Sequence, residues 1–444
     1  MTDDRPRGEA FVQGLIDRDR ADVPAALRQA SFADPGDVVV PPERYISRAY
    51  HDLEVARVWS RVWQMACREE DIPAVGDHVV YDVADLSLIV VRTEGGIRAF
   101  HNSCLHRGTQ LRTAAGHVDE FRCPFHGFTW SLDGALVRIP CPWDFPQVDP
   151  ATFRLPEARV GVWGGFVFVN PDQDAVPLED YLEILPAHFA AWPLEDRWKS
   201  AHVVRTLPCN WKVAMEAFIE SYHTVAVHPQ LLRTTGDSDT EYDVYADSRH
   251  ISRMVTPVGV PSEHMDREVT DDEILRLMFS TRDGEEVRPG ANAREVIADR
   301  TRAAIAADTG GPLVMSDTEA VDAVEYFVFP NFMPWPSYTT PLVYRFRPNG
   351  NDPDSSVIDV MLLQPVPASG RPPAARPRVL GPGESFADAP ELGYLGRILN
   401  QDFSTFARIQ RGLHASVRPR LTLAHYQESR IRHFHATLTS YVGS

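Results

Sequence analysis

Two short segments of this sequence each pair a cysteine with a nearby histidine. Cys104 and His106 form the first pair, and Cys123 and His126 form the second. A structural zinc site more often groups cysteine with cysteine and histidine with histidine. Here each segment supplies one thiolate and one imidazole. This arrangement suits a cluster of two unlike irons, one held by the two thiolates and the other by the two imidazoles.

This two-thiolate, two-imidazole ligand set is that of a Rieske [2Fe–2S] centre, in which histidine replaces cysteine on one iron and raises the reduction potential. The flanking residues extend the pattern through Asn102–Gly108, Gly127–Trp130 and Asp133-Gly134. Together they resemble the Rieske domain of ring-hydroxylating non-haem iron oxygenases, specifically the large (α) subunit. The alternative is a zinc knuckle or a set of scattered structural cysteines and histidines.

A second group of candidate metal ligands lies in residues 210–229, a stretch with no helix breaker before its final proline. The pattern predicts a buried helix. Glu216, Glu220 and His223 stand at i, i+4 and i+7 and would share one face. His228 follows His223 by five residues, about 140° away on an ideal helix. The helix must therefore end or distort if both histidines bind one ion.

Residues 391–416 offer a third candidate ligand. A stripe of apolar residues with alternating steps of three and four has one gap, which falls at Asp402. A lone carboxylate facing a core is costly unless it is paired or bound to a metal. His223, His228 and Asp402 would form the two-histidine, one-carboxylate site of non-haem Fe(II) oxygenases. The alternatives are an ion pair of Asp402 with Arg408 and His228 as a core histidine. The stripe consists of Leu392, Leu395, Leu399, Phe406, Ile409 and Leu413.

The resemblance to the α-subunit family extends over most of the chain. It runs through Asn210-Trp-Lys, Glu220-x-Tyr-His223-x4-His228-Pro229, Phe329-Pro-Asn331, Asp402-x7-Gln410-Arg-Gly-Leu and Gln427-Glu-Ser-Arg-Ile-Arg-His-Phe-His435. It implies an α+β fold, with an antiparallel β Rieske domain and a helix-grip catalytic domain in which an antiparallel sheet wraps long helices. We expect an N-terminal arm at residues 1–44, the Rieske domain at 45–172 and the catalytic domain at 173–444.

The resemblance also assigns roles to individual residues. Glu220 takes the place of a carboxylate, usually aspartate, that contacts an iron-ligand histidine and a cluster histidine of the next subunit, here His126. Ala217, Phe218 and Asn331 are the expected substrate-pocket residues. The chain departs from the family pattern in two places, because Glu220 is one methylene longer than aspartate and Ala217 stands where many members have asparagine.

Several secondary-structure predictions follow from periodicity. Helical character is expected for residues 9–29 and 44–68, whereas period-two alternation predicts strands at 77–84 and 86–92. Residues 230–312 form a long polar stretch with helical segments at 273–279 and 291–307, separated by turns at 282–284 and 289–290. This stretch would be either a lid over the site or a surface insertion.

The composition excludes some classes of protein. Aspartate and glutamate outnumber lysine and arginine, 62 to 44, giving a net charge of −18 without basic runs. This argues against nucleic acid or an anionic membrane as a partner. The five cysteines form no disulfide framework. With no signal peptide or membrane span recognisable in the sequence, we expect a cytoplasmic protein.

The function predicted from this resemblance is that of an oxygenase terminal component. It would use O2 to mono- or dihydroxylate an apolar, aromatic or polycyclic substrate. Its cofactors would be a Rieske [2Fe–2S] cluster and a mononuclear Fe(II), and its electrons would come from NAD(P)H through a ferredoxin or flavin reductase. The electron path between subunits implies a homotrimer or an α3β3 assembly. The alternatives are an oxidative demethylase or monooxygenase of a non-aromatic substrate, a Rieske electron-transfer protein without catalytic iron, and a zinc-stabilised binding protein.

Overall fold

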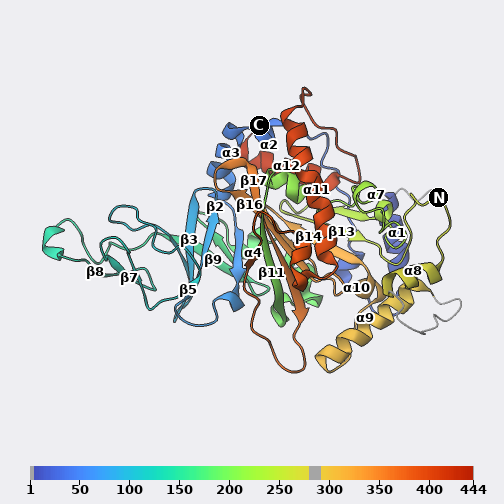
Figure 1. Ribbon diagram of the computed structural model, residues 1–444, viewed down its shortest axis with the longest axis horizontal. Coiled ribbons are helices and arrows are strands. Elements are labelled where there is room, and N and C mark those ends of the chain that lie inside the picture. The colour runs from blue at the N-terminus through green and yellow to red at the C-terminus, as the bar shows by residue number, and fades with distance from the viewer. Residues whose placement is uncertain (1–4, 280–291, 444) are drawn as a thin grey trace.

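The computed structural model describes residues 5–279 and 292–443. Three antiparallel sheets and a set of surrounding helices make up this part of the chain. The smallest sheet lies at one end of the molecule, a seven-stranded sheet lies next to it, and an eight-stranded sheet with most of the long helices forms the other half (Figure 1).

The seven-stranded sheet has the order β1-β10-β9-β4-β3-β2-β5, with every neighbouring pair antiparallel. The strands predicted at 77–84 and 86–92 are confirmed as β2 and β3. The strands are β1 (Gln64–Arg68), β2 (Asp77–Val83), β3 (Leu86–Thr93), β4 (Gly96–His101), β5 (Gly116–His117), β9 (Glu157–Trp163) and β10 (Phe166–Asn170).

The three-stranded sheet is inserted between β5 and β9 and carries the second candidate cluster segment. Its strands are β6 (Glu120–Arg122), β7 (Thr129–Ser131) and β8 (Leu136–Arg138). The loop from β6 to β7 contains Cys123 and His126, whereas Cys104 and His106 follow β4. A separate apolar cluster that includes both cysteines, Phe121 and Trp130 lies beneath the two loops.

The eight-stranded sheet has the order β12-β13-β14-β15-β16-β17-β11-β18, and only the short β18 runs parallel to its neighbour. Its strands are β11 (Arg197–Leu207), β12 (Glu241–Val244), β13 (Ile251–Thr256), β14 (Ala323–Val328), β15 (Phe332–Pro334), β16 (Leu342–Asn349), β17 (Asp352–Pro365) and β18 (Arg378–Val379).

The helices lie mainly around this larger sheet (Figure 1). They are α1 (Arg7–Ile16), α2 (Glu43–Ile46), α3 (Arg48–Glu54), α4 (Leu178–Tyr181), α5 (Leu185–His188), α6 (Trp211–Glu216), α7 (Thr224–Val227), α8 (Asp271–Phe279), α9 (Ala293–Thr309), α10 (Asp317–Val321), α11 (Leu395–His414) and α12 (Ser429–Val442).

Two of the predicted helices are shorter in the structure. In the first, helical character ends at Ile16 and returns only as a short 3-10 turn at Ala25–Arg28. The second, predicted for 44–68, breaks into α2, α3 and a π-turn, and then becomes β1. All five residues of β1 are buried, and they pair with β10, which lies about a hundred residues later. Pairing with a distant strand therefore overrides the local helical pattern.

A buried ionic group joins the seven-stranded sheet to the eight-stranded sheet. Arg345 on β16 binds both carboxylate oxygens of Asp359 on β17, at 2.8 and 3.0 Å. The same guanidinium donates to the backbone carbonyls of Met65 and Ala66 on β1. His202 on β11 contacts Asp359 at 2.9 Å. Because the Arg345 guanidinium binds both the buried carboxylate and the backbone of β1, this ionic group fixes how the two sheets meet.

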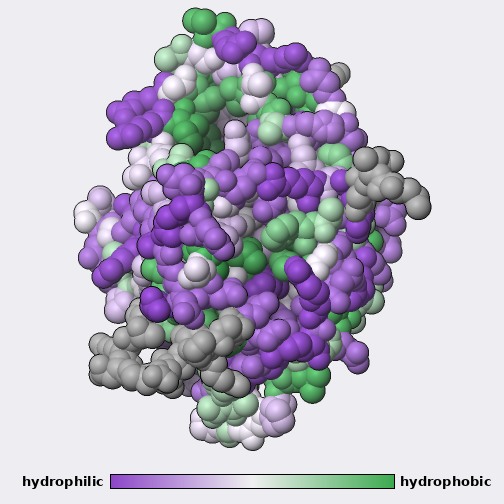
Figure 2. Space-filling view, turned by 90° about the vertical axis from the view of Figure 1, so that its right-hand side faces the viewer, coloured by the Kyte–Doolittle hydropathy of each residue, from purple (hydrophilic) through white to green (hydrophobic). Residues whose placement is uncertain are grey.

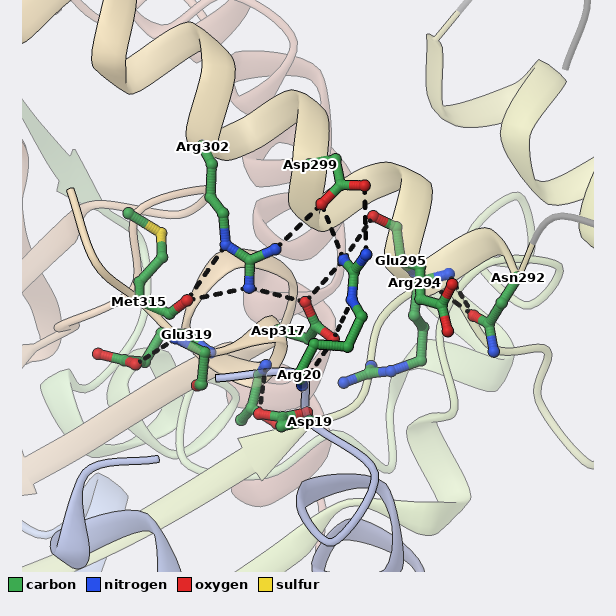
Figure 3. Close-up of polar contacts among 12 residues, drawn as sticks. Asp19, Arg20, Asn292, Arg294, Glu295, Asp299, Arg302, Met315, Asp317 and Glu319 are labelled. Atoms are coloured by element: carbon green, nitrogen blue, oxygen red, sulfur yellow. Dashed lines mark hydrogen bonds and ion pairs between the residues drawn. The ribbon is translucent and has the colours of Figure 1, made fainter. Parts of the chain in front are cut away.

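The N-terminal arm contacts α9 and α10 through a network of ion pairs that are partly exposed and partly buried (Figure 3). Arg20 of the arm lies between Asp317 and Asp299, with N–O distances of 2.9 Å to each. Arg302 on α9 reaches the same Asp317 at 2.7 Å. The predicted helices of the 230–312 stretch are confirmed as α8 and α9, and the turns predicted between them, at residues 282–284 and 289–290, lie outside the described residues.

The face seen from the right-hand side of Figure 1 is largely hydrophilic, with apolar side chains gathered in a band at the height of α11 and α12 (Figure 2). Within the residues that the structure describes, no helix combines the length and the apolar character needed to cross a membrane.

Candidate functional site

The two cluster loops have the same backbone hydrogen-bond pattern. In the first, the Cys104 N–H donates to the Thr109 carbonyl at 2.8 Å, and the Gly108 N–H donates back to the Cys104 carbonyl at 2.8 Å. In the second, the Cys123 N–H donates to the Phe128 carbonyl at 2.8 Å. Each loop is thus a closed turn of six residues that presents a cysteine at its start and a histidine inside.

A glycine with positive φ completes each turn. Gly108 has φ 75° and Gly127 has φ 77°, a conformation that residues with a Cβ rarely adopt. Both glycines stand four residues after the cysteine of their loop. This explains why the two segments share a Cys-x-(x)-His-(x)-Gly pattern in the sequence.

The four donor side chains of the loops converge. Both cysteines, Cys104 and Cys123, are buried, and the rings of His106 and His126 lie 4.7 Å apart. His106 also stacks on Phe128 at 4.6 Å, while His126 is exposed. Burial raises the pKa of Cys104. It also opposes ionisation of Cys123, but backbone N–H groups of its loop outweigh burial and lower the pKa of that thiol.

The donor atoms of these four residues do not lie close enough together to bind a single metal ion. Among the described residues, the only group of three or more histidine, cysteine or carboxylate donors whose atoms all lie within 4.8 Å of one another is elsewhere in the chain. One zinc ion is therefore a poor fit to the two loops. A two-iron cluster, which spans a larger gap between its thiolate pair and its imidazole pair, fits them.

The prediction of one long helix over residues 210–229 is wrong for its middle part. Helix α6 ends at Glu216 and α7 begins at Thr224, so the intervening residues turn instead of continuing the helix. Because of this break, His223 and His228 lie together, with ring centroids 5.3 Å apart. On a continuous helix they would have faced directions about 140° apart.

Side chains satisfy the backbone groups that the break leaves free. The Ser221 N–H donates to the hydroxyl of Tyr242 on β12 at 2.9 Å. The His223 N–H donates to Glu220 Oε2 at 3.0 Å, and Nδ1 of the same histidine lies 2.7 Å from Glu220 Oε1. Glu220 therefore stabilises the turn and orients the imidazole at the same time.

Both imidazoles point their Nε2 atoms at Asp402 on α11. The Nε2 of His228 lies 2.7 Å from Asp402 Oδ1, and the Nε2 of His223 lies 3.5 Å from it. These three residues are the group that meets single-ion spacing. The alternative pairing of Asp402 with Arg408 is not observed. Burial disfavours the charged form of His223, but Glu220 and Asp402 outweigh burial and raise its pKa.

The second nitrogens of the two histidines show where their protons lie. Nδ1 of His223 faces the Glu220 carboxylate, and Nδ1 of His228 lies 3.0 Å from Gln401 Oε1. Oxygen acceptors at both Nδ1 atoms leave Nε2 of each neutral ring with a lone pair. Two such lone pairs and a carboxylate oxygen then face one another. A divalent cation fits this donor set, because it stabilises three acceptors that would otherwise repel.

A cavity of about 270 Å³ opens beside this group. Of the predicted pocket residues, Ala217 lines it. No described residue of the 230–312 stretch lines it, which favours a surface insertion over a lid. The lining residues are Tyr45, Val213, Glu216, Ala217, Glu220, His223, Val227, Asp402, Thr405, Phe406, Ile409, Leu413, Leu421, Glu428 and Ile431.

The other two predicted pocket residues lie elsewhere. Phe218 belongs to an aromatic group, with its ring 4.8 Å from Tyr344 and 5.5 Å from Phe346. Asn331 is fully buried in the hairpin between β14 and β15, beside the Tyr81 phenol of the seven-stranded sheet. It does not line the cavity.

Sequence reasoning missed a buried polar network in the cavity wall. The Tyr45 hydroxyl lies 3.0 Å from both oxygens of Glu216, and His435 Nε2 lies 2.9 Å from Glu216 Oε1. Burial raises the pKa of Glu216 to about 8, against the lowering effects of Tyr45, Lys212 and Arg44. The only sequence signal for this site was the presence of Glu216 on an apolar stretch.

The chain matches two family profiles. Residues 188–444 match the family described as ring hydroxylating alpha subunit (catalytic domain), and residues 62–149 match the Rieske [2Fe-2S] domain. The glycine betaine monooxygenase oxygenase subunit of Chromohalobacter salexigens is 32% identical over 248 residues, 54% of each chain. The anthranilate 1,2-dioxygenase large subunit of Acinetobacter baylyi is 31% identical over 236 residues, 50% of this chain and 47% of its own. The chain thus spans about half the length of the curated relatives it matches.

Solved structures share the fold along nearly the whole chain. A quaternary ammonium Rieske monooxygenase has a TM-score of 0.65 at 18% identity, covering 92% of this chain and 96% of its own. Naphthalene 1,2-dioxygenase from Rhodococcus sp. has a TM-score of 0.59 at 20% identity, covering 91% and 94%. The predicted α+β fold is confirmed, and the two matched domains imply a Rieske cluster and a mononuclear iron as cofactors. The chain belongs to the family of ring-hydroxylating oxygenase α subunits.

Proposed function

We propose that this chain is the terminal component of a Rieske-type oxygenase, which uses O2 to oxidise a small organic substrate. Cys104, His106, Cys123 and His126 would hold the [2Fe–2S] cluster. His223, His228 and Asp402 would hold the iron. When bound, the cluster supplies single electrons and the iron supplies coordination positions for O2.

The convergence of Nε2 of His223, Nε2 of His228 and Oδ1 of Asp402 carries this proposal. A Rieske electron-transfer protein has no use for a second buried donor group of this kind. A zinc-stabilised binding protein would need the donor atoms of the two cysteines and two histidines to lie close enough together for one ion, and they do not. Both alternatives therefore account for less of the chain than an oxygenase does.

Electrons would enter beside the first cluster loop, on a side that the neighbouring chain leaves open. Arg107 is exposed there. A ferredoxin or a flavin reductase that draws electrons from NAD(P)H is the donor that we propose. The exposed arginine suits an acidic partner surface.

We also propose that the electron path crosses between chains. Within one chain, β7 and β8 lie at one end, whereas α7 and α11 lie in the other half beyond the larger sheet (Figure 1). The cavity beside the iron site carries the carboxylates of Glu220 and Asp402, and no lysine or arginine is among its described lining residues. The loop tip that carries His126 also carries Arg122, so the two surfaces are complementary in charge. A ring of three or more chains, a homotrimer or an α3β3 assembly, would bring them together.

Co-expression of two inactive variants tests this arrangement. Cys104→Ser removes a cluster ligand, and Asp402→Ala removes an iron ligand, so neither variant turns over alone. In rings that mix the two variants equally and at random, about half of the chains have an intact iron site, and about half of those have a neighbour with an intact cluster. A working pair therefore arises at about a quarter of positions. Recovery of roughly that fraction of wild-type turnover supports transfer between chains. No recovery in rings shown to contain both variants contradicts it.

For the reaction, we propose hydroxylation of an apolar, aromatic or polycyclic substrate. The support is the apolar part of the cavity lining beside the iron site. Val213, Phe406 and Ile409 line the cavity. Such side chains favour flat apolar molecules.

Oxidative demethylation or monooxygenation of a non-aromatic substrate is the second candidate. It is favoured by the match to the glycine betaine monooxygenase subunit. Turnover of aromatic and methylammonium substrates under 18O2 separates the two. One or two labelled oxygens in a ring product indicate hydroxylation, whereas release of formaldehyde indicates loss of a methyl group.

We also propose that the N-terminal arm ends at residue 44 and that the Rieske domain ends at residue 172.

A further inference from the structure

Two glutamines from distant parts of the chain form a closed pair behind the iron site. Gln401 lies on α11, directly before Asp402, and Gln230 follows α7. The Gln230 Nε2 donates to Gln401 Oε1 at 2.7 Å, and the Gln401 Nε2 donates to Gln230 Oε1 at 3.3 Å. The same Gln401 Oε1 accepts from His228 Nδ1 at 3.0 Å.

The contact with His228 shows which atom Gln401 presents. A glutamine can offer either its oxygen or its nitrogen to a neighbour, because the two ends have nearly the same shape. Gln401 Oε1 lies 3.0 Å from His228 Nδ1, and Gln230 pairs with both ends of the same amide and holds it against the histidine. The Nδ1 of His228 then carries the proton, and its Nε2 keeps a lone pair directed at Asp402.

The opposite amide orientation would close the site. If Gln401 offered its Nε2 instead, the Nδ1 of His228 would have to accept. Its proton would then lie on Nε2, 2.7 Å from Asp402 Oδ1. That arrangement is an ordinary hydrogen bond between histidine and carboxylate, and it leaves no lone pair on this histidine for a metal ion.

We propose that Gln401, held in place by Gln230, is a positioning residue that keeps His228 in its metal-binding tautomer. The inference deepens the proposed function, because it presumes that His223, His228 and Asp402 bind iron. It also gives the two histidines unlike supports. His223 is oriented by the anionic Glu220, whereas His228 is oriented by a neutral amide that pairs with Gln230.

Metal affinity of the full-length, cluster-loaded protein tests the proposal without relying on activity. Co(II) is titrated into protein that keeps its cluster but lacks the mononuclear iron, and isothermal titration calorimetry reports binding. Gln401→Leu keeps the side-chain size but removes the acceptor, and it should weaken Co(II) binding about 10- to 100-fold, the range for loss of a group that orients a metal ligand. Gln230→Leu should weaken binding in the same direction by a smaller factor.

Gln401→Glu is the decisive variant, because glutamate can only accept at this position. It should bind Co(II) at least as tightly as wild type, since either carboxylate oxygen can accept from the Nδ1 of His228. Thermal unfolding of each variant excludes a simple folding defect. Arg411→Gln, an exposed change on the same helix, is the matched control and should bind as wild type does.

Equal affinity of Gln401→Leu and wild type would overturn the proposal. Weak binding by Gln401→Glu together with near-normal binding by Gln401→Leu would also overturn it, because the amide would then present its nitrogen. Failure of the proposed function is a separate result. In that case wild-type protein itself binds no Co(II), or Asp402→Ala binds it as well as wild type does.

Discussion

The proposed cluster loops and the proposed iron site differ in how the chain assembles them. All four cluster donors come from residues 104–126, on two turns with matching backbone bonds and matching glycines. The iron site joins His228 to Asp402 across 174 residues and needs a broken helix to do so. The first site is exposed on one side, whereas His228 and Asp402 are each about 3% exposed.

The difference has a physical origin. Two short turns can form correct geometry from local backbone bonds alone, so the cluster site depends little on the larger sheet. A site made from α6, α7 and α11 exists only when those elements are packed. We therefore expect damage to the cluster loops to stay local, and damage to the packing of the catalytic half to reach the iron site.

The largest predicted effect is loss of the cluster in Cys104→Ser. A hydroxyl is a poor substitute for a thiolate ligand, so the visible spectrum of the cluster and its labile sulfide should disappear. Iron bound at the Asp402 site should remain at about one per chain. Loss of that second iron as well would contradict the independence of the two sites.

Asp402→Ala is the reciprocal change. It should weaken iron binding at the second site by more than about 100-fold, the upper range for changes to a group that only orients a ligand. Product formation should then be undetectable while the cluster spectrum is unchanged. Normal turnover by this variant would refute the assignment of Asp402 as a ligand.

Arg345→Met tests the junction between the two sheets. It leaves Asp359 buried without its main partner, which typically costs about 3–5 kcal/mol. Urea unfolding followed by far-UV circular dichroism should show that loss. Arg408→Met, an exposed arginine on α11, should change stability by less than about 0.5 kcal/mol. A small effect at Arg345 would mean that the sheets do not depend on this ionic group.

The smallest effect concerns pH. Because the pKa of Glu216 is raised to about 8 from an ordinary 4.5, the folded chain holds this proton more tightly than the unfolded chain. Its contribution to stability is therefore full below pH 4.5 and is lost as the pH rises through about 8. Between pH 6 and 8 the loss should be roughly 2 kcal/mol.

Glu216→Gln should flatten this part of the stability profile, measured by urea unfolding at each pH. Glu179→Gln removes the same charge at an exposed position and should leave the profile as in wild type. A Glu216→Gln profile that falls as steeply as that of wild type would show that another group is responsible.

The cluster loops could be predicted from sequence because their geometry is local. Cysteine, histidine and glycine spacing fixes both turns. Asp402 could be predicted for a different reason, since it interrupts an otherwise apolar stripe on a regular helix. In both cases one short segment carries the whole signal.

Other features could not be predicted because their cause lies far away in the sequence. The helix break after Glu216 depends on the Tyr242 hydroxyl, which satisfies the Ser221 N–H. The change from helix to strand at residues 64–68 depends on β10. Gln401 was missed because an amide that pairs with Gln230 leaves no periodic pattern.

Iron and acid-labile sulfide per chain, with the visible spectrum of aerobically purified protein, test the central claim most directly. The account predicts about three irons and two sulfides per chain, with the red-brown colour of a Rieske cluster. Two irons and two sulfides that do not rise on addition of Fe(II) would contradict the iron site. Zinc without sulfide would contradict the account of both sites.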